Sequence, residues 1–102
     1  MHPIVEAKRA EAAEVCRRSG VVRLEVFGSA ARVDFDEARS DIDFLVLLGR
    51  DSASSAFDAY FALKDALEQV FGRPVDLVSD GAVHNPYIKA AIDRDRQLVY
   101  AA

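Results

Sequence analysis

With 102 residues, 51% of them apolar, the sequence predicts one small domain over residues 1–102, whose core needs neither disulfides nor a structural metal. The net charge of −4 is mild and argues against broad nucleic-acid binding, which needs a positive field to displace counterions from phosphates. No apolar run approaches the roughly 20 residues of a membrane span, and no Cys/His cluster has zinc-site spacing, so we expect neither a membrane partner nor a zinc centre.

The first predicted element is a helix over residues 4–18, begun by Pro3 and stopped by Gly20. Charged residues interrupt the segment, which is typical of an amphipathic helix and not of a signal peptide. The single cysteine, Cys16, cannot form an internal disulfide, which fits a reducing, cytoplasmic setting and a role as a small core residue. The apolar stripe of this helix consists of Ile4, Val5, Ala12, Val15 and Cys16.

Strands are predicted over residues 21–27, 41–48 and 75–78, with a final edge strand over 97–100. A helix is predicted from about Ser54, with Ser52 or Ser54 as its cap, to Phe71. Its expected apolar face contains Phe57, Tyr60, Phe61, Leu63, Leu67, Val70 and Phe71.

The last predicted helix begins with Asn85 as N-cap and Pro86 as its first residue, and runs to about Arg94. The sign-alternating segment 93–96 is expected to be a solvated helix end. The order of elements predicts an α/β fold of the α+β kind, a small mixed β-sheet flanked by helices.

Asp41 and Asp43 are the residues most indicative of chemistry. Side chains alternate along a strand, so Ile42 and its alternate neighbours enter the core while the two acids share the other face. Two carboxylates held this close repel unless a cation lies between them, and Mg²⁺ prefers a few carboxylates plus phosphate oxygens. Asp76 interrupts the strand at 75–78 in the same way. If the two strands are neighbours, the three acids converge and can hold two metal ions roughly 4 Å apart.

Gly28 and Ser29 supply a candidate phosphate site at the end of the first strand. Glycine lets a backbone approach a phosphate closely, and Ser29 is expected to open a short helix over residues 30–32 whose free N–H groups favour an anion. Arg32 lies one turn on and is a candidate charged fork for a phosphate.

The string GSAARVDFDEARSDIDFLV, residues 28–46, resembles the signature of the polymerase-beta-like nucleotidyltransferase superfamily, and specifically its minimal nucleotidyltransferase branch. The stretches 75–78 and 85–88 are similar to the C-terminal half of that branch, so the likeness covers most of the chain from Val21 onward. Val33 departs from the pattern, because the branch has glycine after the arginine, and the gap to Asp41 is one residue longer.

The resemblance implies roles for the candidate residues. Asp41 and Asp43 would bind two Mg²⁺ ions, Asp76 would bind metal or act as the base, and Gly28 and Ser29 would bind the triphosphate of ATP. The branch resembles MntA-type antitoxins, which are thought to transfer AMP to a tyrosine of a HEPN ribonuclease toxin. This implies an AMP-transferring antitoxin whose partner is a HEPN-type toxin, with that toxin or a second copy of this chain completing the site.

Other interpretations stay open. Asp41 and Asp43 are also explained as solvated acids, Asp76 as a strand-edge acid, and Ser29 as a plain helix cap. Arg32 and Arg39 are more often surface arginines than ligands. The chain as a whole is also explained as a non-catalytic antitoxin that neutralises its toxin by covering it, or as an enzyme that modifies a small molecule.

Overall fold

The computed structural model describes the chain apart from residues 33, 35, 39 and 50–55. The predicted α+β class is confirmed, and each strand bound lies within one residue of its prediction. The expected helix start at Ser54 and its serine cap lie outside the described residues. The elements in chain order are α1 (Pro3–Arg18), β1 (Val21–Phe27), the 3-10 helix η1 (Gly28–Ala30), β2 (Ile42–Leu48), α2 (Ala56–Phe71), β3 (Val75–Ser79), α3 (Pro86–Asp95) and β4 (Gln97–Ala101).

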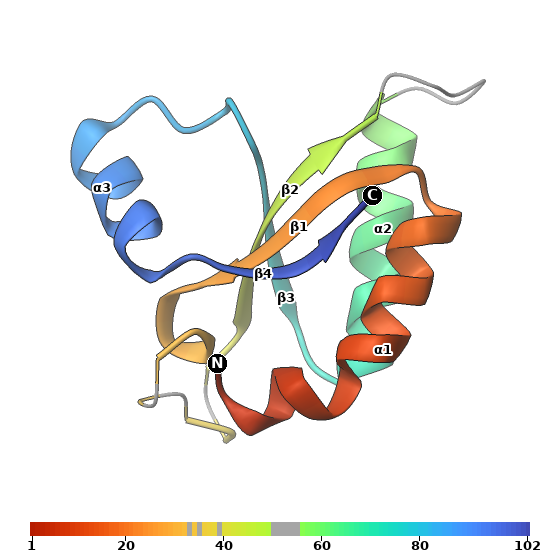
Figure 1. Cartoon of the computed structure of the whole chain (residues 1–102), viewed down its shortest axis with the longest axis horizontal. Helices are drawn as coiled ribbons and strands as arrows, with labels where there is room; N and C mark the ends of the chain where they lie inside the picture. Colours follow the sequence, from red (N-terminus) through yellow and green to blue (C-terminus); the bar gives the residue numbers. More distant parts are fainter. Residues whose placement is uncertain (33, 35, 39, 50–55) are drawn as a thin grey trace.

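The four strands form one mixed sheet in the order β3-β2-β1-β4. The β1–β2 and β1–β4 pairs are antiparallel, whereas β2 and β3 are parallel, with α2 as the crossover between them. Helices α1 and α2 pack together on one face of the sheet, and α3 lies on the other side (Figure 1). As predicted, β1 and β2 are the central strands and β4 lies at an edge.

The main core lies between the sheet and the pair α1 and α2. Alternate residues of the two central strands enter it, as the period of two predicts. Cys16 is completely buried there, and burial raises the pKa of its thiol to about 12, so it is an inert core residue as expected. The fully or almost fully buried core residues of these elements are Val5, Ala12, Cys16, Leu24, Val26, Ile42, Phe44, Val46, Leu63 and Leu67.

The predicted apolar face of α2 is too wide. Phe57 and Phe61 are 69% and 45% exposed, whereas Leu63, Leu67 and Phe71 are buried. The helix presents one stripe to the core, and the two phenylalanines at its start lie beside that stripe and stack on each other at 4.7 Å between ring centroids. No helix among the described residues is both long and apolar enough to cross a membrane.

The start of α3 agrees with the prediction. The Asn85 side chain accepts hydrogen bonds from the backbone N–H groups of Tyr87 and Ile88, at 2.9 and 3.3 Å, and Pro86 is the first helical residue. These bonds satisfy donors that a helix start leaves without an intrahelical partner. They fix where α3 begins, and so which of its side chains face the sheet.

Candidate functional site

Asp43 on β2 and Asp76 on β3 are direct register partners in the parallel pair. Neighbouring strands lie about 4.8 Å apart, and partners at the same register present their side chains to the same face. The predicted convergence of the acids required β2 and β3 to be neighbours. The structure confirms this, and with it the convergence of Asp43 and Asp76. Both acids lie on the face opposite α1 and α2, because Ile42 and Phe44 on either side of Asp43 are buried in the core.

Asp43 is the electrostatically strained member of the pair. Burial, together with the negative charges of Asp76 and Asp41, raises the pKa of its carboxyl to about 6, while Arg32 acts in the opposite direction. Like charges and desolvation both disfavour the ionised form. A cation beside Asp43 would favour the ionised carboxylate and so oppose this shift.

The expected convergence of Asp41, Asp43 and Asp76 is seen for Asp43 and Asp76 but not as a group of three. Among the residues that the structure describes, no three His, Cys, Asp or Glu side chains come close enough together to hold one ion. Asp41 is exposed and lies just before β2, outside the strand register that aligns Asp43 with Asp76. The charge of Asp41 still acts on Asp43, because it is one of the causes that raise the pKa of that carboxyl.

Gly28 follows β1 directly and lies against Asp43. A Cβ at Gly28 would be only 2.5 Å from Asp43 Oδ2, and its φ of +69° belongs to the left-handed region that glycine tolerates. Ser29, half-buried, lies next to it. The short helix begins at Gly28 and ends at Ala30, so the predicted helix over 30–32 is wrong by two residues, because the left-handed glycine itself forms the first position.

Arg32 is held by acids rather than left free for a phosphate. Its guanidinium donates to Asp34 Oδ1 at 3.1 Å and also pairs with Asp95 at the end of α3. The expected charged fork is therefore already occupied on both sides. Gln97 donates to Ala31 O at 3.2 Å, so two contacts tie the loop after η1 to the α3–β4 junction. Val33 and Arg39 lie outside the described residues.

A second polar group lies further along the same face and was missed in the sequence. Glu25 on β1, only 8% exposed, accepts from Arg96 Nε at 2.8 Å, and Arg23 Nε lies 2.8 Å from its other oxygen. These arginines hold the pKa of Glu25 below its ordinary value, with the Arg96 hydrogen bond as the largest cause. Arg96 also binds Asp93, so the prediction of a solvated end at residues 93–96 is wrong for this group. The sequence did contain a signal for this group, because Glu25 is an acid among the core residues of a central strand.

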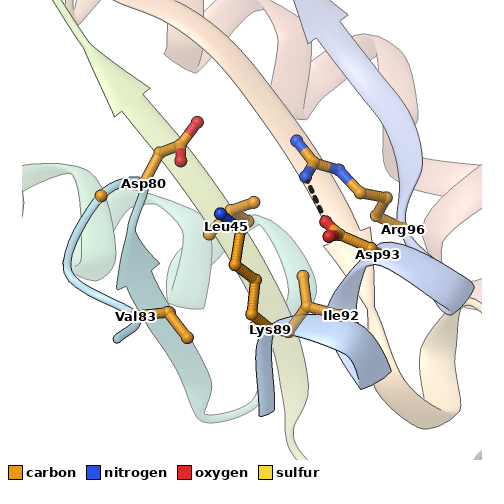
Figure 2. A pocket seen from close by; sticks show the side chains of 8 residues that line it. Leu45, Asp80, Val83, Lys89, Ile92, Asp93 and Arg96 are labelled. Carbon is orange, nitrogen blue, oxygen red and sulfur yellow. Dashed lines mark hydrogen bonds and ion pairs between the residues drawn. The ribbon is translucent and has the colours of Figure 1, made fainter. Parts of the chain in front are cut away.

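A small hollow, partly open to solvent, lies between β2 and α3 (Figure 2). Leu45 from β2 forms one wall, and Ile92 and Lys89 from α3 lie opposite. Leu45 shares a face with Asp43, because residues two apart along a strand point the same way. The hollow therefore lies on the same face of the sheet as the paired acids, which are not among its lining residues. Its remaining lining residues are Asp80, Gly81, Val83, Asp93 and Arg96.

The donor set of the site fits Mg²⁺. This ion is usually bound through one or two carboxylates and completes its shell with waters and substrate phosphates, so it does not need a three-acid cage. Asp43 and Asp76 provide two hard oxygen ligands from neighbouring strands, and Asp43 carries uncompensated negative charge. The Gly28 turn beside them leaves a backbone without a side chain where a phosphate would approach.

Comparison with known proteins identifies the family of this chain. The model of the nucleotidyltransferase domain family matches residues 10–99. A Methanocaldococcus jannaschii protein named "Putative protein adenylyltransferase" is 39% identical over 80 residues, which cover 78% of this chain and 76% of that protein. A solved structure named "putative minimal nucleotidyltransferase" is 33% identical and covers 95% of each chain with a TM-score of 0.76.

A more distant likeness shows the fold alone. A chain from the solved complex of a tri-AMPylated HEPN toxin with an MNT antitoxin, from Shewanella oneidensis, is 17% identical with a TM-score of 0.65. The match covers 95% of this chain and 72% of that one.

Proposed function

The chain belongs to the nucleotidyltransferase domain family as a minimal nucleotidyltransferase, and from that premise we propose that it transfers AMP from Mg²⁺–ATP to a hydroxyl group of a partner protein. The observation that carries the proposal is the register pairing of Asp43 with Asp76 beside the Gly28 turn. Two acids on one face next to a side-chain-free turn suit a metal–triphosphate complex.

Each residue has a role in this reaction. Asp43 and Asp76 would hold the metal, with Asp41, directly before β2, as a further ligand, and Gly28 and Ser29 would bind the phosphates through the turn. Bound Mg²⁺ supplies positive charge for the phosphate oxygens and for the leaving pyrophosphate. The acceptor hydroxyl oxygen forms the new bond to the α-phosphorus while the bond from that phosphorus to the bridging oxygen breaks. Asp76, which is exposed, takes the hydroxyl proton, and pyrophosphate leaves.

A protein acceptor is supported by the relatives. The Methanocaldococcus jannaschii protein is named for adenylyl transfer to protein, and a HEPN toxin in the distant complex carries AMP groups. We therefore propose a HEPN-type toxin as the partner, a tyrosine hydroxyl as the acceptor and an antitoxin role for this chain. The same complex also suggests the second candidate, a non-catalytic antitoxin that neutralises its toxin by binding.

Neutralisation in cells separates these two candidates. The test expresses a HEPN-type toxin together with wild type, or with the double variant Asp41→Ala, Asp43→Ala. The matched control is Glu6→Ala, Asp65→Ala, which removes two exposed acids from α1 and α2 on the far side of the sheet. An enzyme predicts that the control protects cells and the double variant does not. Full protection by a stably folded double variant would favour the binding antitoxin instead.

A further inference from the structure

We propose that the hollow between β2 and α3 is a nucleoside subsite, which holds a purine base against Leu45 and Ile92 (Figure 2). This inference rests on the proposed function, since it assumes that the paired acids receive the triphosphate. Leu45 and Ile92 are each only 5% exposed, and half-buried Val83 adds a third apolar group. Leu45 and Ile92 thus form an apolar floor. A flat base that leaves water to lie over it gains its contact mainly from Val83 and from the stem of Lys89.

The position of the hollow matches the shape of a nucleotide. Leu45 lies two residues beyond Asp43 on the same face of β2, which is about 6.6 Å along the strand. A ribose separates the α-phosphate from the base by a comparable span. With the phosphates at Gly28 and the α-phosphate near Asp43, the base therefore reaches Leu45 and the facing side of α3.

One polar group that lines the hollow, the ammonium of Lys89, is a hydrogen-bond donor with no partner of its own among the described residues. Asp80 is paired with Arg23, and Asp93 with Arg96, so both carboxylates are already bound. Lys89 has neither an ion pair nor a hydrogen bond within the part of the chain that the structure describes. It is alone in this among the lysines and arginines that the structure describes. Its side chain extends from α3 into the space facing β2 (Figure 2). Every purine carries a ring-nitrogen acceptor at N7, which an ammonium donor such as Lys89 can bind.

The acceptor side chain does not fit this place as well. A tyrosine ring held in the hollow over Leu45 would keep its hydroxyl away from the phosphorus, because Leu45 lies two residues beyond Asp43 along β2. The hydroxyl has to reach the phosphorus beside Asp43 instead. We therefore assign the hollow to the nucleoside and leave the open space over Asp76 to the acceptor.

Two ligands that differ only in the nucleoside test the assignment. Calorimetry with Mg²⁺ measures the binding of ATP and of inorganic tripolyphosphate to wild type, Val83→Trp and Lys89→Ala. Tryptophan at position 83 fills the hollow, and Lys89 is exposed, so its removal leaves the fold intact. The control for the first variant is Ala62→Trp, on the exposed side of α2, and the control for the second is Lys8→Ala on α1.

The inference predicts that Val83→Trp weakens ATP binding at least about tenfold, the size expected for losing a shaped apolar contact, and leaves tripolyphosphate binding unchanged. Lys89→Ala should weaken ATP severalfold with the same selectivity, and both controls should match wild type. If both pocket variants bind ATP as wild type does, or lose the two ligands equally, the nucleoside subsite is wrong while the proposed function stands. If wild type binds neither ligand, the proposed function fails, and this inference fails with it.

Discussion

The carboxylate of Asp43 occupies the position where any side chain at Gly28 would begin: a Cβ there would lie 2.5 Å from Asp43 Oδ2. The same glycine has a φ of +69°, so its identity is fixed both by backbone conformation and by contact. Two segments that are 15 positions apart in the chain thus meet at one point, because β1 and β2 pair antiparallel with Phe27 opposite Asp43.

Replacing Gly28 by alanine should disable nucleotide binding more than folding. The left-handed φ costs about 1–2 kcal/mol for an L-residue, and the new methyl group displaces the Asp43 carboxylate. Gly72→Ala is the matched control, because Gly72 also has a positive φ, +65°, but no atom lies within 4 Å of its Cβ position. Urea melts should show similar losses of stability for the two variants, and calorimetry should show loss of Mg²⁺–ATP binding only for Gly28→Ala. Equal binding by both variants would contradict the role of this contact.

Asp43→Asn should stabilise the metal-free protein while removing its response to Mg²⁺–ATP. Asparagine keeps the shape of the side chain and removes a charge that burial, Asp76 and Asp41 all disfavour. At pH 7.5 we expect a gain of about 1 kcal/mol in the free energy of unfolding, after allowance for screening by water. Thermal melts with and without Mg²⁺–ATP measure both effects. A variant that the ligand stabilises as much as wild type would remove Asp43 from the site.

The same pKa shift predicts a pH dependence in EDTA. Unfolded Asp43 ionises near 3.8, whereas in the folded protein its pKa is about 6, so between these values the folded state binds more protons. The stability of wild type relative to Asp43→Asn should therefore be greatest at about pH 4, fall as the pH rises to 6, and then level off. Denaturant midpoints of the two proteins at several pH values measure the difference. A difference that is constant, or that grows with pH, would show that Asp43 is not destabilised by its neighbours.

Glu25 should stabilise the fold through its two arginines. Glu25→Gln leaves Arg96 and Arg23 without their shared carboxylate and should cost about 1.5–3 kcal/mol at pH 7. Because the folded pKa of Glu25 lies below its ordinary 4.5, this stabilisation is present above pH 4.5 and is lost as the pH falls through the folded pKa. Glu11→Gln, which breaks an exposed pair with Lys8, is the control and should cost less than about 1 kcal/mol. Equal losses at pH 7 would refute the structural role of Glu25.

Local pattern was enough to predict most of the fold. The alternation along β2 correctly placed Ile42 and Phe44 in the core and Asp43 on the other face, and Asn85 with Pro86 correctly marked the start of α3. These features depend on residues within one turn or one strand, which the sequence displays directly. The adjacency of β2 and β3 was only a condition of the sequence argument, and the structure supplies it through a parallel pair joined by α2.

Contacts between distant segments were not predictable in the same way. Arg32 pairs with Asp95, and Arg96 with Glu25, across 63 and 71 positions of the chain. Local sequence gives no sign of either partner, so Arg32 was predicted as a free ligand and residues 93–96 as a solvated end. The register that aligns Asp43 with Asp76 and leaves Asp41 just before β2 likewise depends on how two distant strands pair, which the spacing of the three residues does not encode.

The most direct test of the proposed activity uses ATP labelled with ³²P at either the α or the γ phosphate. The chain, Mg²⁺ and a HEPN-type protein encoded beside it are incubated with each form, and the proteins are separated on a denaturing gel. AMP transfer predicts that the partner gains label from α-labelled ATP alone, that γ-label leaves as pyrophosphate, and that Asp41→Ala, Asp43→Ala abolishes the transfer. Label from the γ position, or undiminished transfer by the double variant, would contradict nucleotidyl transfer at these acids.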